Sequence, residues 1–148
     1  MNFQIIKYKR KHKNQIISVW ESSVLATHHF LNSTDYLKIR ALFHEYDFKV
    51  LDMYCLAKQD HVIGFIGVYN HKIEMLFLEP AYIGQGWGKQ LIKFAIEQQG
   101  ATLVDVNEQN INAKNFYEKA GFQVFERTEK DGFGKSYPLL KMELKLIP

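Results

Sequence analysis

Cysteine is almost absent from this chain of 148 residues, because Cys55 is the only one. A single cysteine cannot form an internal disulfide, which favours a reducing compartment, and we expect a cytoplasmic protein. No apolar run reaches the roughly 20 residues of a membrane-spanning helix. The amino terminus is polar and basic with no apolar stretch behind it, so no signal peptide is expected. No group of His, Cys, Asp and Glu has metal-ligand spacing, and we expect no metal.

The chain also lacks a large excess of charge of either sign. Its 19 Lys and Arg residues oppose 16 Asp and Glu residues, and the net charge of +3 is too small to predict nucleic-acid binding. The basic run from Lys7 to Lys13 is interpreted as a solvated turn, with a contribution to anion binding as the alternative. Hydrophobic residues make up 47% of the chain, with 11 Phe and 8 Tyr, which is enough for a full core. We expect one domain spanning residues 1–148.

Strand and helix signals alternate along the chain without repeats or a linker. Short apolar or alternating runs predict strands, and apolar residues at i, i+3, i+4 and i+7 predict helices. The order is β-α-α-β-β-β-α-β-α-β-β, which predicts an α/β fold with a mixed sheet and helices on both faces. We expect strands at 3–8, 52–58, 62–69, 72–78, 101–106, 122–128 and 137–144, and helices at 16–28, 32–43, 88–99 and 110–120.

The most informative stretch is an apolar strand, a glycine-rich loop and an amphipathic helix between residues 72 and 100. Gly84, Gly86 and Gly88 stand at alternate positions, which lets several backbone N–H groups turn the same way and a ligand come close. These N–H groups open a helix whose positive dipole end favours an anion, and Lys89 adds a charge. We therefore predict a phosphate site here, with an ordinary glycine-rich turn as the alternative.

Two common phosphate loops do not fit this spacing. A Walker A loop requires one more residue between Gly84 and the Gly-Lys pair, and a Rossmann fingerprint requires a third glycine where Lys89 stands. The strand, the G-x-G-x-G loop and the helix instead resemble the acetyl-CoA loop of the GNAT N-acetyltransferases. Residues 110–122 resemble the N-x-x-A-x-x-F-Y-x-x-x-G-F segment of that family at every specified position.

The resemblance to the GNAT family covers residues 62–125. It is strongest to small bacterial members of unassigned substrate, which share Ala-Thr-His at 26–28 and Gly-Lys-x-Tyr-Pro-Leu-Leu at 134–140. It implies a mixed sheet of about seven strands flanked by about four helices. It also implies an acetyl-CoA-dependent enzyme in which a primary amine attacks the thioester directly. The family loop usually begins with Gln or Arg where this chain has Ile83, so one phosphate-contacting side chain is missing.

The resemblance assigns acetyl-CoA to three segments. The backbone of residues 76–78 would pair with the pantetheine arm, and the glycine loop would hold the pyrophosphate. Asn110 would reach the arm, and Tyr117 would lie by the sulfur as general acid, with a packed aromatic as the alternative role for Tyr117. The implied cofactor-binding residues are Leu76, Phe77, Leu78, Gly84, Gln85, Gly86, Trp87, Gly88, Lys89, Asn110, Ala113 and Tyr117.

Glu74 matches the position of the base glutamate in related histone acetyltransferases, and an exposed strand-end charge is an equally weighted alternative. Asp105 is a weaker candidate for the base, and a water chain could replace either. His28 and Tyr137 are weak candidates for substrate contact. On a helix, His28 and the adjacent His29 diverge by about 100°, so they cannot bind one metal together.

The acceptor amine carries no motif, so small-molecule amines and peptide amines both remain open, as do a monomer and a homodimer. Whether the acyl group is only acetyl is also open. The alternatives to an amine acetyltransferase are a non-catalytic acyl-CoA-binding or regulatory module and a protein N-terminal acetyltransferase. The presence of both Glu74 and Tyr117 argues against the first. Cys55 is interpreted as a small buried residue and not as a nucleophile.

Overall fold

The computed structural model describes residues 3–27 and 31–145. In this part of the chain, seven strands form one sheet in the order β1-β2-β3-β4-β5-β7-β6. The sheet is mixed, since β4 and β5 run parallel and the other neighbouring pairs are antiparallel. The predicted mixed α/β fold is confirmed. The strands are β1 (Gln4–Lys7), β2 (Asp52–Lys58), β3 (His61–Tyr69), β4 (Lys72–Leu78), β5 (Leu103–Asn107), β6 (Phe122–Thr128) and β7 (Leu139–Leu144).

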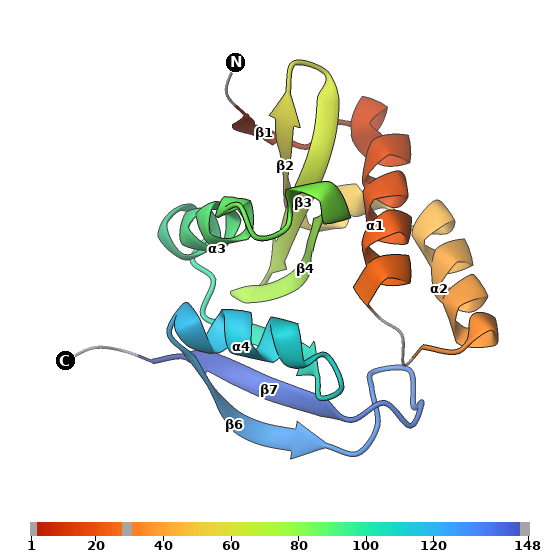
Figure 1. Cartoon of the computed structure of the whole chain (residues 1–148), viewed down its shortest axis with the longest axis vertical. Helices are drawn as coiled ribbons and strands as arrows, with labels where there is room; N and C mark the ends of the chain where they lie inside the picture. The colour runs from red at the N-terminus through yellow and green to blue at the C-terminus, as the bar shows by residue number, and fades with distance from the viewer. Residues whose placement is uncertain (1–2, 28–30, 146–148) are drawn as a thin grey trace.

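The helices of the described residues lie on both faces of the sheet. They are α1 (Lys13–Thr27), α2 (Ser33–Glu45), α3 (Trp87–Gln98) and α4 (Ile111–Lys119). In Figure 1, α1 and α2 stand together at the right, α3 lies at the left, and α4 lies below β4. The stacking of Trp20 on Phe43, with ring centroids 4.5 Å apart, joins α1 to α2.

Two hydrophobic cores result, one on each face of the sheet. Neighbouring residues of β3 point to opposite faces, so Phe65 joins the core under α1 and Ile66 joins the core under α3. Leu91, Ile92 and Ala95 of α3 are buried in the second core, as the helical spacing predicted. Cys55 is fully buried in the first core, which confirms its interpretation as a core residue.

Some predicted boundaries were wrong by one to three residues. The last strand begins at Leu139 and not at Tyr137, because Pro138 has no N–H and the N–H of Tyr137 donates to the carbonyl of Lys135 at 2.8 Å. The strand expected from Ala101 begins at Leu103, since the N–H of Ala101 still donates to the carbonyl of Ala95 in α3.

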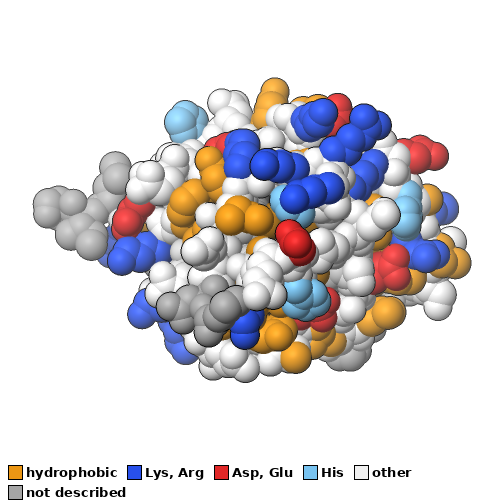
Figure 2. Space-filling model, turned by 90° about the horizontal axis from the view of Figure 1, so that it is seen from above, with side chains coloured by type: hydrophobic (Ala, Val, Ile, Leu, Met, Phe, Trp, Pro, Cys, Tyr) orange, Lys and Arg blue, Asp and Glu red, His pale blue; other side chains and the backbone are white. Residues whose placement is uncertain are grey.

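The basic run near the amino terminus lies at the surface. Arg10–His12 forms a 3-10 turn, and Lys9, Arg10 and Lys11 are exposed, as expected for a solvated turn. The predicted turn is shorter than the basic run, because Lys7 belongs to β1 and Lys13 begins α1. Figure 2 looks down on the end of the molecule that is uppermost in Figure 1, where β1 lies. Lys and Arg side chains are gathered on part of this face. In the described ranges, none of the helices has the length and apolar character that crossing a membrane requires.

Candidate active site

A cleft opens between β4 and β5 because the two strands pair only briefly. They pair at Lys72 with Leu103 and at Ile73 with Val104, and then separate. Beyond Ile73, β4 and β5 no longer pair in the described part of the chain, and an extended ligand could add along this edge of β4 as a strand does. The cleft has a volume of about 530 Å³ and is lined from the glycine loop to α1.

A β-bulge places Glu74 at the cleft. Gly67 pairs with Met75 and Val68 pairs with Ile73, so Glu74 is the extra residue on β4. A bulge bends its strand and changes the direction of a side chain, and bulges are common beside active sites. Glu74 is exposed, lines the cleft and makes no ion pair with any other described residue. Its carboxylate is therefore available to a substrate.

The glycine loop forms one end of the cleft. Gly84 and Gly86 have φ angles of +84° and +90°, and a Cβ at either position would meet no atom within 4 Å, so the space beside them is open. Gly86 is the N-cap of α3, and because glycine has no side chain it cannot accept a hydrogen bond from the first helical N–H groups. The N–H groups of the first helical turn, at Trp87, Gly88 and Lys89, are thus left for an anion. This geometry fits the pyrophosphate of acetyl-CoA.

Helix α4 forms another wall of the cleft. The side-chain oxygen of Asn110 accepts from the N–H of Ala113 at 3.1 Å and caps the helix, and this cap leaves the side-chain NH₂ group unused. Ala113 and Tyr117 fall on the face that lines the cleft. Gly88 allows α4 to approach α3 closely, because a Cβ there would stand 3.3 Å from the ring of Phe116.

Tyr117 is both packed and open to the cleft. Its ring meets Phe116 and Phe122 edge-on, at centroid distances of 5.1 and 5.8 Å, and only 7% of the residue is exposed. The hydroxyl of Tyr117 makes no hydrogen bond to another described residue. It is nevertheless not a fully enclosed atom, since Gln99 Oε1 is the single side-chain N or O atom of the described residues that is both enclosed and without a partner. The Tyr117 hydroxyl is therefore open to the cleft that the residue lines. Burial raises the pKa of Tyr117, which keeps the phenol protonated at neutral pH.

Known proteins resemble this chain in both sequence and fold. The family model described as an acetyltransferase (GNAT) domain matches residues 51–124. Peptidyl-lysine N-acetyltransferase YjaB of Salmonella typhimurium is 33% identical over 142 residues, which cover 96% of this chain and 98% of that protein. The chain belongs to the GNAT acetyltransferase family. It is an N-acetyltransferase, an enzyme that transfers an acetyl group to an amine, as the sequence predicted.

Solved GNAT structures agree with this fold. The solution structure of apo-form YjaB from Escherichia coli has a TM-score of 0.87 and 30% identity, and the match covers 97% of each chain. PaiA N-acetyltransferase from Thermoplasma acidophilum, solved in complex with coenzyme A, has a TM-score of 0.71 and 23% identity over 97% of this chain and 99% of that one. The second likeness concerns the fold alone. Together they confirm the predicted GNAT fold.

Two loop residues of this GNAT protein turn away from the cleft. The side chain of Gln85 donates to the carbonyl of Ala81 at 3.1 Å, and Trp87 packs edge-on against Phe3 with centroids 5.2 Å apart. Their contribution to a phosphate site is therefore limited to backbone N–H groups. Ile83, at the position where the family has Gln or Arg, lines the cleft and is half exposed.

The other predicted acceptor-side residues lie in different surroundings. Asp105 lines the cleft, but its carboxylate lies 2.5 Å from the ammonium of Lys72. Tyr137 lies outside the cleft lining, and its hydroxyl donates to Asp35 at 2.6 Å, which ties the loop before β7 to the start of α2. His28 lies outside the described residues. Of the two that the structure describes, Asp105 lines the cleft with Glu74 and Tyr137 does not.

Helix α1 contributes two cleft residues that the sequence analysis missed. Ser23 and Thr27 line the cleft, and the hydroxyl of Thr27 donates to the carbonyl of Ser23 at 2.7 Å. The available signal was a serine three residues after the buried Trp20, on a stripe that is otherwise apolar.

Within the described ranges, no three His, Cys, Asp or Glu side chains come together as a metal site.

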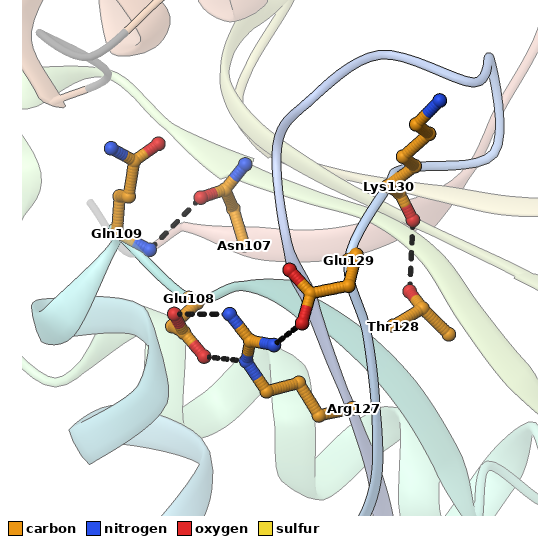
Figure 3. Close-up of polar contacts among 7 residues, drawn as sticks. All are labelled: Asn107, Glu108, Gln109, Arg127, Thr128, Glu129 and Lys130. Atoms are coloured by element: carbon orange, nitrogen blue, oxygen red, sulfur yellow. Dashed lines mark hydrogen bonds and ion pairs between the residues drawn. The ribbon is translucent and has the colours of Figure 1, made fainter.

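The turn before α4 is held from a distant strand. Arg127 at the end of β6 binds both carboxylate oxygens of Glu108 and also contacts Glu129 at 2.5 Å (Figure 3). In the same turn, the N–H of Gln109 donates to the side chain of Asn107 at 2.9 Å. A bidentate Arg–carboxylate pair fixes orientation as well as position. It therefore helps to set the place where Asn110 begins α4.

Proposed function

We propose that the cleft binds acetyl-CoA and that the enzyme acetylates the ε-amine of lysine side chains in peptides or proteins. One arrangement carries the proposal: the N–H groups of the glycine loop, the open edge of β4, Glu74 and Tyr117 meet at a single cleft. A phosphate cradle, an amide-pairing edge, a carboxylate and a phenol are the groups that thioester aminolysis requires.

Acetyl-CoA binding uses the backbone more than side chains. The helix start at residues 87–89 holds the pyrophosphate through N–H groups and the helix dipole. The edge of β4 at residues 76–78 pairs with the amides of the pantetheine arm, as an added strand would. Asn110 lines the same cleft, and its side-chain NH₂ group would donate to the same arm. PaiA N-acetyltransferase, which has the same fold, was solved with coenzyme A, and this supports the assignment.

The reaction begins at Glu74 and ends at Tyr117. The substrate ammonium gives one proton to Glu74, directly or through water, and the free amine attacks the thioester carbonyl. The C–N bond forms, the C=O electron pair moves to oxygen, and a backbone N–H near Phe77 or Leu78 stabilises the oxyanion. The C–S bond then breaks, Tyr117 protonates the sulfur, and the proton lost by the new amide nitrogen restores the phenol. The products are the amide, the CoA thiol and one proton.

The lysine acceptor is supported by the relatives. The YjaB proteins of Salmonella typhimurium and Escherichia coli are named peptidyl-lysine N-acetyltransferases, and they are 33% and 30% identical to this chain over nearly their whole lengths. Asp105 is a less suitable base than Glu74, because its carboxylate is already held by Lys72. We therefore assign the proton-accepting role to Glu74.

The test is acetyl transfer to two matched peptides. One carries a lysine and a blocked amino terminus, and the other has a free amino terminus and no lysine. Release of CoA thiol together with a mass gain of one acetyl group on the blocked lysine peptide is the expected result. Transfer only to the free amino terminus would favour N-terminal acetylation. Calorimetric binding of acetyl-CoA with no thiol release from either peptide would favour a non-catalytic module.

Two variants assign the chemistry within that test. Glu74→Gln keeps the size of the side chain but cannot accept the proton, and we expect turnover to fall by roughly 10²-fold or more near neutral pH. Asp105→Asn is the matched control, because it makes the same change on the other carboxylate of the cleft. A larger loss in Asp105→Asn than in Glu74→Gln would move the base to Asp105.

A further inference from the structure

A second cavity, of about 380 Å³, shares Glu74 and Met75 with the cleft. Its other walls are Tyr46, Val50 and Leu51 from the connection between α2 and β2, and Tyr69 at the end of β3. Glu74 therefore borders two spaces, because the bulge places it between them. One space is the proposed acetyl-CoA cleft, and the other is the second cavity.

The walls of this second cavity are aromatic and aliphatic, with a single carboxylate. Val50 and Tyr69 are more than half exposed and form its mouth. Tyr46 is held deeper by an edge-on contact with Phe48, with centroids 5.1 Å apart. The pKa of Tyr46 is raised by burial first and by the negative charge of Glu74 second, so the phenol and the carboxylate lie within electrostatic reach. The described residues place no Lys or Arg on the lining.

We propose that this second cavity is the acceptor subsite, in which Tyr46, Val50 and Tyr69 receive the methylene stem and ammonium of a lysine side chain. A hydrocarbon stem gains by contact with aliphatic and aromatic walls, and an ammonium is attracted by tyrosine faces and by a carboxylate. Because Glu74 also lines the cleft, an amine held here is delivered to the side of β4 where the thioester lies. This inference rests on the proposed function and adds the route of the acceptor.

Opposite charges at Val50 give a test that a purely structural effect cannot imitate. Val50 is 58% exposed, so Val50→Lys and Val50→Glu should both fold. We expect the KM for the blocked lysine peptide to rise about three- to fivefold in Val50→Lys and to fall about as much in Val50→Glu. Both changes should shrink in 0.5 M salt, and the affinity for acetyl-CoA should stay constant. Shifts of KM in the same direction, or no shift, would overturn the proposal.

Removal of the mouth aromatic is the second measurement. Tyr69→Ala should raise the KM for the lysine peptide about fivefold with kcat little changed, in line with the loss of a cation–π contact of about 1 kcal/mol. Phe125→Ala is the matched control, since Phe125 is also half exposed but lies on β6 outside both cavities. Equal KM values for the two variants would contradict the assignment.

Direct binding separates this inference from the proposed function. With n-butylammonium as the probe, NMR signals of Tyr46, Val50 and Tyr69 should shift on titration, and Val50→Lys should weaken the binding. Such shifts in an enzyme that acetylates no lysine peptide would support the subsite and overturn the lysine acceptor. Shifts confined to other residues, or none, would overturn the subsite even if lysine peptides are acetylated.

Discussion

At Tyr117, one oxygen atom separates a packing role from a catalytic one. The ring is fixed between Phe116 and Phe122, and this contact would persist without the hydroxyl. The raised pKa means that the phenol still carries its proton well above neutral pH, so the proton is in place at each turnover. The two roles therefore predict different results when the oxygen alone is removed.

We expect Tyr117→Phe to lower turnover by about 10²–10⁴-fold, because the leaving thiolate loses its acid. The fold and the affinity for acetyl-CoA should change little, since the ring remains. Tyr54→Phe is the control, because Tyr54 packs against Phe94 and does not line the cleft. Turnover of Tyr117→Phe, compared with Tyr54→Phe in the thiol-release assay, decides the point. Near-normal turnover would return Tyr117 to a packing role and leave water to protonate the sulfur.

At the scale of the element, the glycine loop is a backbone site, and its side chains matter by their absence. Gly86→Asp should weaken acetyl-CoA binding by roughly 10- to 100-fold, because a carboxylate would stand beside the pyrophosphate. Gly134→Asp is the matched control: Gly134 also has a positive φ, of +76°, with open space around it, but it lies outside the cleft. Calorimetry should show normal affinity in the control. Unchanged affinity for acetyl-CoA in Gly86→Asp would show that the pyrophosphate does not bind at this loop.

The elements were predictable because each is encoded locally. Apolar spacing over residues 87–98 is sufficient to predict α3 and its buried face, and glycine spacing is sufficient to predict an anion loop. The bulge at Glu74 was not predictable, because register depends on how β4 meets β3. The contact of Tyr137 with Asp35 joins residues that are 102 positions apart, so no local pattern could reveal it. The cleft itself follows from the separation of β4 and β5, which is a property of the assembled sheet.

For the whole molecule, buried acids make stability depend on pH. Burial raises the pKa of Cys55 from an ordinary value of 9.0 to about 12. The folded protein then keeps a proton that the unfolded chain loses above pH 9, so stability is complete below that pH and declines as the pH rises toward 12. The limiting slope for one such group is about 1.4 kcal/mol per pH unit.

Cys55→Ala should therefore flatten the alkaline decline of stability. The variant should be less stable near pH 8, by about 1 kcal/mol, because it leaves a small cavity in the core under α1. Between pH 9 and pH 10.5 the difference from the original protein should narrow, since the variant has no thiol to ionise on unfolding. Urea unfolding at several pH values provides the measurement. A constant difference across this range would show that the thiol of Cys55 does not contribute to the pH dependence.

The bulge on β4 has a further consequence for how this enzyme can change. Ile73, Leu76 and Leu78 belong to the core under α3, whereas Met75 and Phe77 belong to the core under α1. If Glu74 is left out, these residues alternate perfectly between the two faces, and β3 pairs with them without interruption. Glu74 is thus an insertion that the sheet does not require. A deletion of this one residue should leave the thermal unfolding temperature nearly unchanged while acetyl transfer is lost. The loss of one codon would then be enough to produce a folded but inactive relative of this enzyme.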